Sequence, residues 1–239
     1  MNEQPIRIAI LDSVPKFHWR DDNGVTDGQK FVDLLAPENV NAKFDIFYVS
    51  EYEFPDIIES YDGYLLTGSP VSVHDNHDWI KMLSEFVGQA DNKNKPIVGV
   101  CFGHQLIAKY FGGVVGNNEK GWMIGSFPLE IKKKFPWMKN TLDTTDLYHF
   151  NKERVTKLPE GAISFASTKD YPDFAYTLGN NIACLQGHPE QPKRAMYNFL
   201  EVTKKVLTEK ELENAKLRIE NGKSDSSIWA QWIMEFFCS

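Results

Sequence analysis

Short apolar runs that alternate with helix-patterned segments most restrict the folds open to this chain. The first run, residues 6–11, is β-branched and interrupted only by Arg7, as in a strand buried on both faces of a sheet. Further strand-like runs lie at residues 43–49, 63–66 and 96–100. Apolar residues with helical spacing lie at residues 30–35, from about residue 76 to residue 87, and at 106–111. This order predicts a parallel sheet with helices on both faces.

The start of the second helix carries a group of polar residues that allows two interpretations. Asp75, followed three residues later by Asp78, resembles a capping signal and predicts a helix start near Asn76. With His74 and His77, the same segment has two histidines and two carboxylates, which is also the composition of a metal site. No second cluster completes such a site, so we interpret the segment as a helix cap and predict no metal and no cofactor.

The pattern changes between Ile124 and about Leu185. Segments 124–131 and 182–185 and the turn sequences at 159–161 and 179–181 predict antiparallel strands added to the sheet. The last 48 residues have a helical pattern that ends in an apolar stripe, which we expect to face the core. This stripe consists of Ile228, Trp229, Trp232, Ile233, Phe236 and Phe237. We find no linker or repeat and therefore expect one α/β domain over residues 1–239.

Composition excludes several classes of function. The formal net charge is −7, which argues against a nucleic-acid partner because phosphate contacts need clustered Lys and Arg. No apolar run reaches the 18 residues of a membrane span, and residues 1–5 do not resemble a signal peptide. Three cysteines indicate a reducing compartment rather than a disulfide scaffold. We therefore expect a cytoplasmic protein with no membrane association.

The most informative segment is 99–105, which reads Gly-Val-Cys-Phe-Gly-His-Gln. A strand that runs into Gly-x-Cys-x-Gly and then a helix predicts a nucleophile elbow, with Cys101 on a strained turn. The helix N-terminus favours a thiolate, and the N–H of Phe102 would point at a developing oxyanion. A buried core cysteine between two packing glycines is the alternative interpretation.

A cysteine nucleophile needs a base that a third group holds in one tautomer. His188 follows the apolar segment 182–185, and Pro189 keeps it extended. Glu190 lies two residues further on and can hydrogen-bond the far ring nitrogen of His188. An ordinary loop histidine is the alternative.

The two motifs together resemble the class I glutamine amidotransferases, a Cys-His-Glu family with a flavodoxin-like, doubly wound core. The second motif, 186–190, reads Gln-Gly-His-Pro-Glu, and segment 67–70 reads Thr-Gly-Ser-Pro, where this family carries an oxyanion-hole glycine. The resemblance extends over nearly the whole chain. It is strongest to free-standing proteins similar to the glutaminase domain of GMP synthetase, a group that includes γ-glutamyl peptidases.

The resemblance implies Cys101 as nucleophile, His188 as general base and acid, and Glu190 as its orienting group. It further implies Gly68 and Phe102 as the oxyanion hole. The resemblance also implies that Gln105 helps to bind the glutamyl part of the substrate.

The substrate-recognition edge departs from the family pattern. Many relatives carry His-x-Asp-x-Val before a Leu-Pro-x-Gly turn. Aligned on Val155, Asn151 replaces the histidine and Glu153 the aspartate, while His149 is shifted by two positions. We keep His149 and Asn151 as candidate substrate-binding residues. Residues 18–20, His-Trp-Arg in the first long loop, are a further candidate for the mouth of the site.

The implied reaction is attack on a γ-carboxamide, loss of ammonia or an amine, and hydrolysis of a γ-glutamyl thioester. Glutaminase and γ-glutamyl peptidase activities would use the same three residues. From the length of 239 residues we expect no ATP-using synthetase domain in this chain. Either a separate synthetase subunit receives the ammonia, or water and small amines are the only acceptors. A silent binding or regulatory module with this fold would have lost a catalytic residue, and none is missing.

Overall fold

The computed structural model describes residues 4–15, 24–39 and 41–239. Its centre is a nine-stranded sheet with the order β2-β1-β3-β4-β11-β10-β9-β6-β7. The first five strands run parallel, and β11 begins the antiparallel part. The parallel strands are β1 (Arg7–Asp12), β2 (Lys43–Tyr48), β3 (Gly63–Leu66), β4 (Ile97–Val100) and β11 (Ile182–Leu185).

The antiparallel part of the sheet contains β6 (Met123–Ile131), β7 (Thr144–Asn151), β9 (Ile163–Ser167) and β10 (Ala175–Leu178). A separate two-stranded sheet pairs β5 (Val114–Asn117) with β8 (Glu153–Lys157). The expected parallel sheet with added antiparallel strands is confirmed. Strand β11 differs from the expectation, because it is antiparallel to β10 but parallel to β4.

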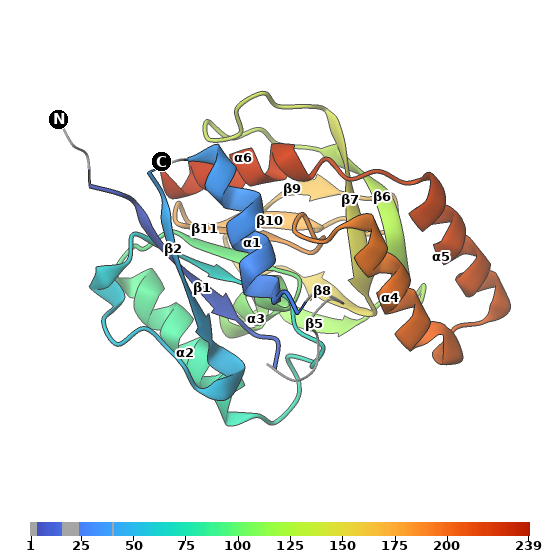
Figure 1. Ribbon diagram of the computed structural model, residues 1–239, viewed down its shortest axis with the longest axis horizontal. Helices are drawn as coiled ribbons and strands as arrows, with labels where there is room; N and C mark the ends of the chain where they lie inside the picture. Colours follow the sequence, from blue (N-terminus) through green and yellow to red (C-terminus); the bar gives the residue numbers. More distant parts are fainter. Residues whose placement is uncertain (1–3, 16–23, 40) are drawn as a thin grey trace.

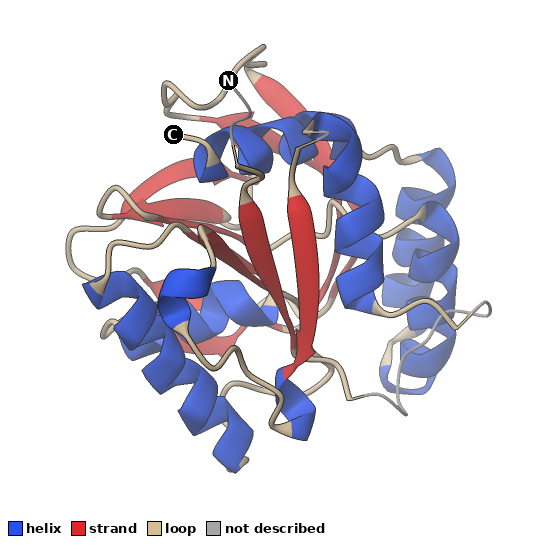
Figure 2. Cartoon of the chain, turned by 60° about the vertical axis from the view of Figure 1, so that its left-hand side comes forward, coloured by secondary structure: helices blue, strands red, loops and turns tan. Residues whose placement is uncertain are grey.

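Helices cover both faces of the sheet (Figures 1 and 2). They are α1 (Asp27–Leu35), α2 (Asp78–Asn92), α3 (Phe102–Tyr110), α4 (Lys193–Thr203), α5 (Glu209–Asn221) and α6 (Ser226–Phe237). Helices α1 and α6 share one core cluster with one face of the sheet, and α2 and α3 share a second cluster with the other. Helices α4 and α5 pack on β6 and β7. Of the described helices, none is long and apolar enough to cross a lipid bilayer.

Two helix starts differ from the expectation. Helix α1 begins at Asp27, before the apolar pattern does, because the Thr26 hydroxyl accepts a hydrogen bond from the Gln29 N–H at 3.2 Å and caps the helix. Helix α2 begins at Asp78, and its N-cap residue, His77, makes no side-chain cap. The predicted cap by Asp75 is wrong, since this carboxylate accepts from the Ser72 N–H at 3.0 Å and closes the preceding turn.

The apolar stripe of α6 faces the core, as the sequence predicts. Trp229 and Trp232 are buried, and both indole N–H groups donate hydrogen bonds. Their acceptors are the Thr145 hydroxyl at 3.1 Å and the Lys139 carbonyl at 2.7 Å. The stripe therefore attaches the final helix to the sheet and to the loop after β6 through apolar packing and two hydrogen bonds.

Replacing Trp232 by Ala should lower the free energy of unfolding by about 3–5 kcal/mol, because it empties a buried aromatic site and leaves the Lys139 carbonyl unpaired. Urea denaturation measures the change. Leu217→Ala on α5 is a suitable control, because Leu217 is 50% exposed and its loss should change stability by about 0.5 kcal/mol or less. Equal losses for the two variants would contradict this role of α6.

Candidate active site

Cys101 occupies a strained turn between β4 and α3. Strand β4 ends at Val100 and α3 begins at Phe102, so Cys101 is the single connecting residue. Its φ of 51° and ψ of −98° lie in a region that residues with a side chain rarely adopt. Such strain persists only where the surroundings fix the backbone. The predicted nucleophile elbow is confirmed in its backbone geometry.

The glycines on either side of the turn are required by close backbone packing. A Cβ atom on Gly99 would lie 2.9 Å from the Gly103 carbonyl, and one on Gly103 would lie 2.6 Å from the Leu66 Cβ. Both distances are shorter than any normal carbon contact. Helix α3 therefore sits against β3 and β4 at a separation that only glycine permits, and this forces the turn at Cys101.

Residues 67 and 68 lie beside this turn and are held from two directions. The Thr67 hydroxyl accepts from the Ser13 N–H at 2.9 Å, and the Thr67 carbonyl accepts from the Gly103 N–H at 3.2 Å. A Cβ on Gly68 would lie 3.1 Å from His188 Cε1 and 3.6 Å from Cys101 Cβ. Gly68 therefore lies directly against both side chains.

The backbone N–H groups of Gly68 and Phe102 have no hydrogen-bond acceptor within the described part of the chain. Phe102 is the first residue of α3, where N–H groups have no partner inside the helix. These two donors flank Cys101 and are free to bind a negatively charged oxygen.

His188 is held beside Cys101 by its backbone and by Glu190. The His188 N–H donates to the Tyr148 carbonyl of β7 at 2.8 Å, which fixes the segment after β11. Glu190 Oε1 lies 2.8 Å from His188 Nδ1, and both side chains are buried. The pair that the sequence predicted is therefore formed, and it leaves Nε2 of the imidazole for Cys101.

The electrostatics around His188 favour the imidazolium. Burial alone lowers its pKa, but the Glu190 carboxylate and Cys101, which also hydrogen-bonds the ring, act in the opposite direction. The net effect raises the pKa of His188 well above its usual value. The imidazole can therefore hold a proton close to the sulfur of Cys101.

Two cavities meet at Cys101. The polar cavity, of about 330 Å³, extends from Cys101 along the loops before α2 and after β7. The α1–α4 cavity, of about 270 Å³, extends between the N-terminal part of α1 and helix α4. Both are lined by Ser69, Pro70, Cys101 and Phe150, whereas His188 lines only the α1–α4 cavity.

The polar cavity holds two of the predicted substrate-binding residues, Gln105 and Asn151, together with Glu153. Gln105 Nε2 donates to the Glu153 carbonyl at 2.9 Å and to Gln186 Oε1 at 3.0 Å. The Asn151 side chain donates to the Glu153 carbonyl at 3.1 Å. Both amide hydrogens of Gln105 are therefore used, and its side-chain oxygen remains as an acceptor in the cavity that Glu153 also lines.

His149 lies elsewhere, which corrects the expectation that it contacts substrate. Its ring is fully buried between Phe127 and Phe174, with ring centroids at 4.9 and 4.7 Å, and it lines neither cavity. The neighbouring Phe150 of β7 lines both cavities, whereas the His149 ring packs in the core between the two phenylalanines. Burial lowers the pKa of His149 to about 3, so the ring is neutral.

A buried polar network beneath the turn was not predicted from the sequence. The Tyr171 hydroxyl donates to Gln186 Oε1 at 3.2 Å and lies 3.4 Å from His104 Nε2, and the Tyr176 hydroxyl donates to the His104 carbonyl at 2.9 Å. Burial lowers the pKa of His104 to about 3. Because Gln186 also contacts Gln105, the network fixes the wall of the polar cavity.

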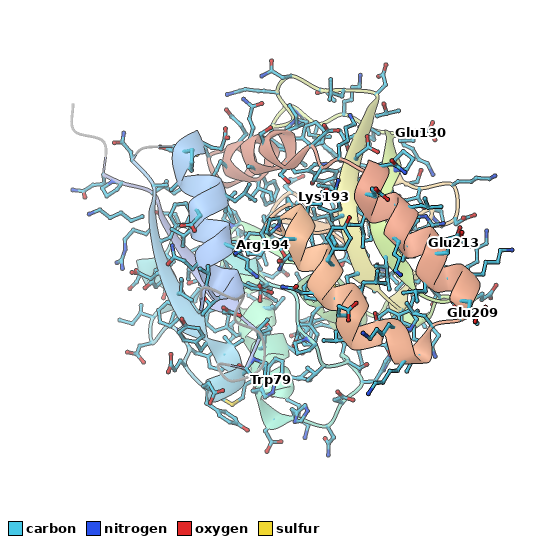
Figure 3. The ribbon with its side chains drawn as sticks, turned by 45° about the vertical axis from the view of Figure 1, so that its right-hand side comes forward. Trp79, Glu130, Lys193, Arg194, Glu209 and Glu213 are labelled. Carbon is cyan, nitrogen blue, oxygen red and sulfur yellow. The ribbon has the colours of Figure 1, made fainter. Side chains whose placement is uncertain are left out.

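The polar cluster at the far wall of the α1–α4 cavity was also not predicted from the sequence. Asp27 and Lys30 form an ion pair at 2.7 Å with both side chains 11% exposed. Gln191, just before α4, donates to Asp27 at 3.0 Å and accepts from Lys30 at 3.2 Å. No sequence pattern connects these residues, since Gln191 and Asp27 are 164 positions apart. Helix α4 begins after Pro192, and Figure 3 labels Lys193 and Arg194 in its first turn.

The remaining candidates from the sequence lie apart from the site. His74 Nε2 is 3.1 Å from the Val115 carbonyl, and His77 stacks on Trp79, which Figure 3 labels. Throughout 4–15, 24–39 and 41–239, no group of three or more His, Cys, Asp or Glu side chains could hold a metal. Cys184 is buried, which raises its pKa to about 12, and Cys238 is exposed. Residues 18–20 lie outside the described residues.

Comparison with known proteins identifies the family to which the chain belongs. The model of the family "Glutamine amidotransferase class-I" matches residues 29–202. γ-Glutamyl peptidase 3 of Arabidopsis thaliana is 28% identical over 216 residues, which cover 86% of each chain. A glutamine-hydrolysing GMP synthase of Wolbachia pipientis is 28% identical over 85% of this chain, but over only 42% of its own length.

A solved glutamine amidotransferase of Thermotoga maritima has the same fold. It aligns with a TM-score of 0.76 at 18% identity and covers 99% of this chain and 97% of its own. The family match extends from α1 to α4 and includes the turn at Cys101 and the His188–Glu190 pair. The chain belongs to the class I glutamine amidotransferase family.

Proposed function

We propose that this protein hydrolyses γ-glutamyl amide bonds through a thioester on Cys101. The observation that carries the proposal is the position of Cys101, on a strained turn between the buried His188–Glu190 pair and the unpaired N–H groups of Gly68 and Phe102. A nucleophile, an oriented acid and base, and an oxyanion site are the three parts that acyl transfer needs.

The first half-reaction forms the thioester. Cys101 attacks the γ-carbonyl carbon as a thiolate, while His188 holds the proton and the carbonyl oxygen becomes an oxyanion bound by the N–H groups of Gly68 and Phe102. The C–N bond then breaks, and the leaving nitrogen takes the proton from His188. Glu190 keeps Nδ1 protonated and directs Nε2 toward the sulfur.

The second half-reaction reverses these roles. His188 takes a proton from water, the resulting hydroxide attacks the thioester carbonyl, and the C–S bond breaks to release glutamate. Cys101 returns to its starting form. The cycle needs a free thiol, and we therefore propose a reducing compartment such as the cytoplasm for this protein.

The polar cavity suits the glutamyl part of the substrate. An α-ammonium group can donate to the Gln105 oxygen and to the Glu153 carboxylate, both of which line this cavity. Ser72 holds the Glu153 carboxylate through a hydrogen bond of 2.7 Å. Asn117 and Lys152 line the same cavity and supply donors for the α-carboxylate.

The relatives suggest two fates for the released amine. γ-Glutamyl peptidases match over most of their own length, which supports a stand-alone hydrolase. GMP synthases match over less than half of theirs, which keeps a separate synthetase subunit as a possible ammonia acceptor. Affinity purification from native extract, followed by activity measurement with and without the co-purified proteins, tests for such a subunit.

Cys101→Ala should abolish hydrolysis, because no other described group at the site can form the acyl intermediate. The assay measures release of glutamate from glutamine and from a panel of γ-glutamyl dipeptides. Cys184→Ala removes a buried cysteine away from the site and is the matched control. Residual activity of Cys101→Ala, or wild-type protein that cleaves no member of the panel, would refute the proposal.

Glu190→Gln should lower the pKa of His188, because it removes the negative charge that raises this pKa while burial still lowers it. Activity that requires the imidazolium is present below this pKa and is lost as the pH rises through it. The alkaline limit of activity should therefore move to lower pH in the variant. NMR titration of the His188 ring checks the shift directly, with His104 and His149 as internal references.

An unchanged alkaline limit together with an unchanged His188 titration would contradict the role of Glu190. The maximal rate should also fall, by about 10²-fold or more, because acid–base catalysis of this kind contributes 10²–10⁴-fold.

A further inference from the structure

Cys101 lies between two cavities, of which the α1–α4 cavity has the more apolar lining. His188 lines only the α1–α4 cavity, and Gln105 and Glu153 line only the polar cavity. In the proposed reaction the leaving nitrogen receives its proton from His188. The leaving amine should therefore depart on the side that His188 lines, which is the α1–α4 cavity.

We propose that the α1–α4 cavity is a leaving-group subsite that selects amines with an apolar side chain, as in γ-glutamyl dipeptides whose second residue is apolar. This inference rests on the proposed function and names its substrate class. In the step concerned, the C–N bond of the tetrahedral intermediate breaks, the nitrogen gains the His188 proton, and the whole amino acid leaves from this cavity.

The size of the cavity is the first argument. Its volume is about 270 Å³. Ammonia is close in size to a water molecule, whose share of liquid volume is about 30 Å³. If ammonia were the only leaving group, most of the cavity would make no contact with the substrate. An amino acid with a large side chain fills it much better.

The chemistry of the walls is the second argument. Apolar groups from three parts of the chain line the cavity: Val14 after β1, Pro70 after β3, and Ala195, Phe199 and Val202 on α4. Phe199 stacks on Phe150 at 4.6 Å with an interplanar angle of 20°. Phe150 lines both cavities, so this aromatic pair extends from the reacting sulfur along the α1–α4 cavity.

The charges at the far end do not favour an ion of one sign. Asp27 and Lys30 line the cavity but neutralise each other at 2.7 Å, and Gln191 hydrogen-bonds to both. An unpaired lysine would select for an anion and an unpaired aspartate for a cation. Apart from this pair and the reacting groups Cys101 and His188, the described residues that line the cavity are uncharged. Shape and apolar contact are therefore the main basis of selection that they offer.

Kinetics with matched substrates tests the inference. We expect kcat/KM for γ-glutamyl-phenylalanine and γ-glutamyl-leucine to exceed those for γ-glutamyl-glycine and glutamine by about tenfold or more, the usual discrimination of an apolar pocket. The four substrates share the glutamyl part and differ only in the group that enters the α1–α4 cavity.

Val202→Asp on α4 should remove this preference. Val202 lines the cavity and is 55% exposed, so the protein should tolerate a carboxylate there, which would oppose an apolar side chain. We expect the ratio of kcat/KM for γ-glutamyl-phenylalanine to kcat/KM for γ-glutamyl-glycine to fall by about tenfold. Val206→Asp is the matched control, because Val206 is 68% exposed and does not line the cavity.

Each result decides the question. A preference for apolar amines that Val202→Asp removes and Val206→Asp keeps supports the subsite. Equal kcat/KM values for the dipeptides and glutamine, or a preference that survives Val202→Asp, would overturn the subsite and leave the proposed function intact. Wild-type protein that hydrolyses none of the four substrates would overturn both.

Discussion

The close approach of α3 to β3 and β4 is the constraint on which the site depends. Gly99 and Gly103 allow this approach, because a Cβ on Gly103 would come within 2.6 Å of Leu66. At this separation a single residue must connect strand and helix, and Cys101 does so with a positive φ. The same packing places the first turn of α3 beside the sulfur, so the partial positive charge of the helix N-terminus is directed at it. The strained turn therefore places the buried Cys101 at the junction of the two cavities and brings an N–H donor next to it.

The order of the strands then assembles the other groups. Strands β3, β4 and β11 are neighbours in the sheet and run parallel, so their carboxyl ends meet at one edge. Gly68 follows β3, Cys101 follows β4 and His188 follows β11. Three segments far apart in the sequence are in this way brought to one point, as is usual for ligand sites in open α/β sheets. The antiparallel strands have a separate effect: the Tyr148 carbonyl of β7 fixes the backbone of His188, and Phe150 separates the polar cavity from the α1–α4 cavity.

The sequence predicts the parts of the site that depend on local pattern. A strand, two glycines and a helix define the turn at Cys101, and Pro189 with Glu190 defines the setting of His188; the structure has both. Features that depend on distant contacts were not predictable. The Asp27–Lys30–Gln191 cluster and the contact of Tyr171 with His104 join residues that no periodicity relates. The burial of His149 was not predictable for another reason. Strand β7 was not located from the sequence, so the direction in which each of its side chains points could not be assigned. The helix cap at Asp75 failed because the same residue can also close the preceding turn.

In the proposed reaction Cys101 alone, among the three cysteines, carries the acyl group. Mass spectrometry of protein quenched in acid during turnover of a γ-glutamyl dipeptide measures this directly. We expect a glutamyl adduct on the peptide that contains Cys101, with Cys184 and Cys238 unmodified. An adduct on either of the other cysteines, or turnover during which Cys101 stays unmodified in every quenched sample, would contradict it.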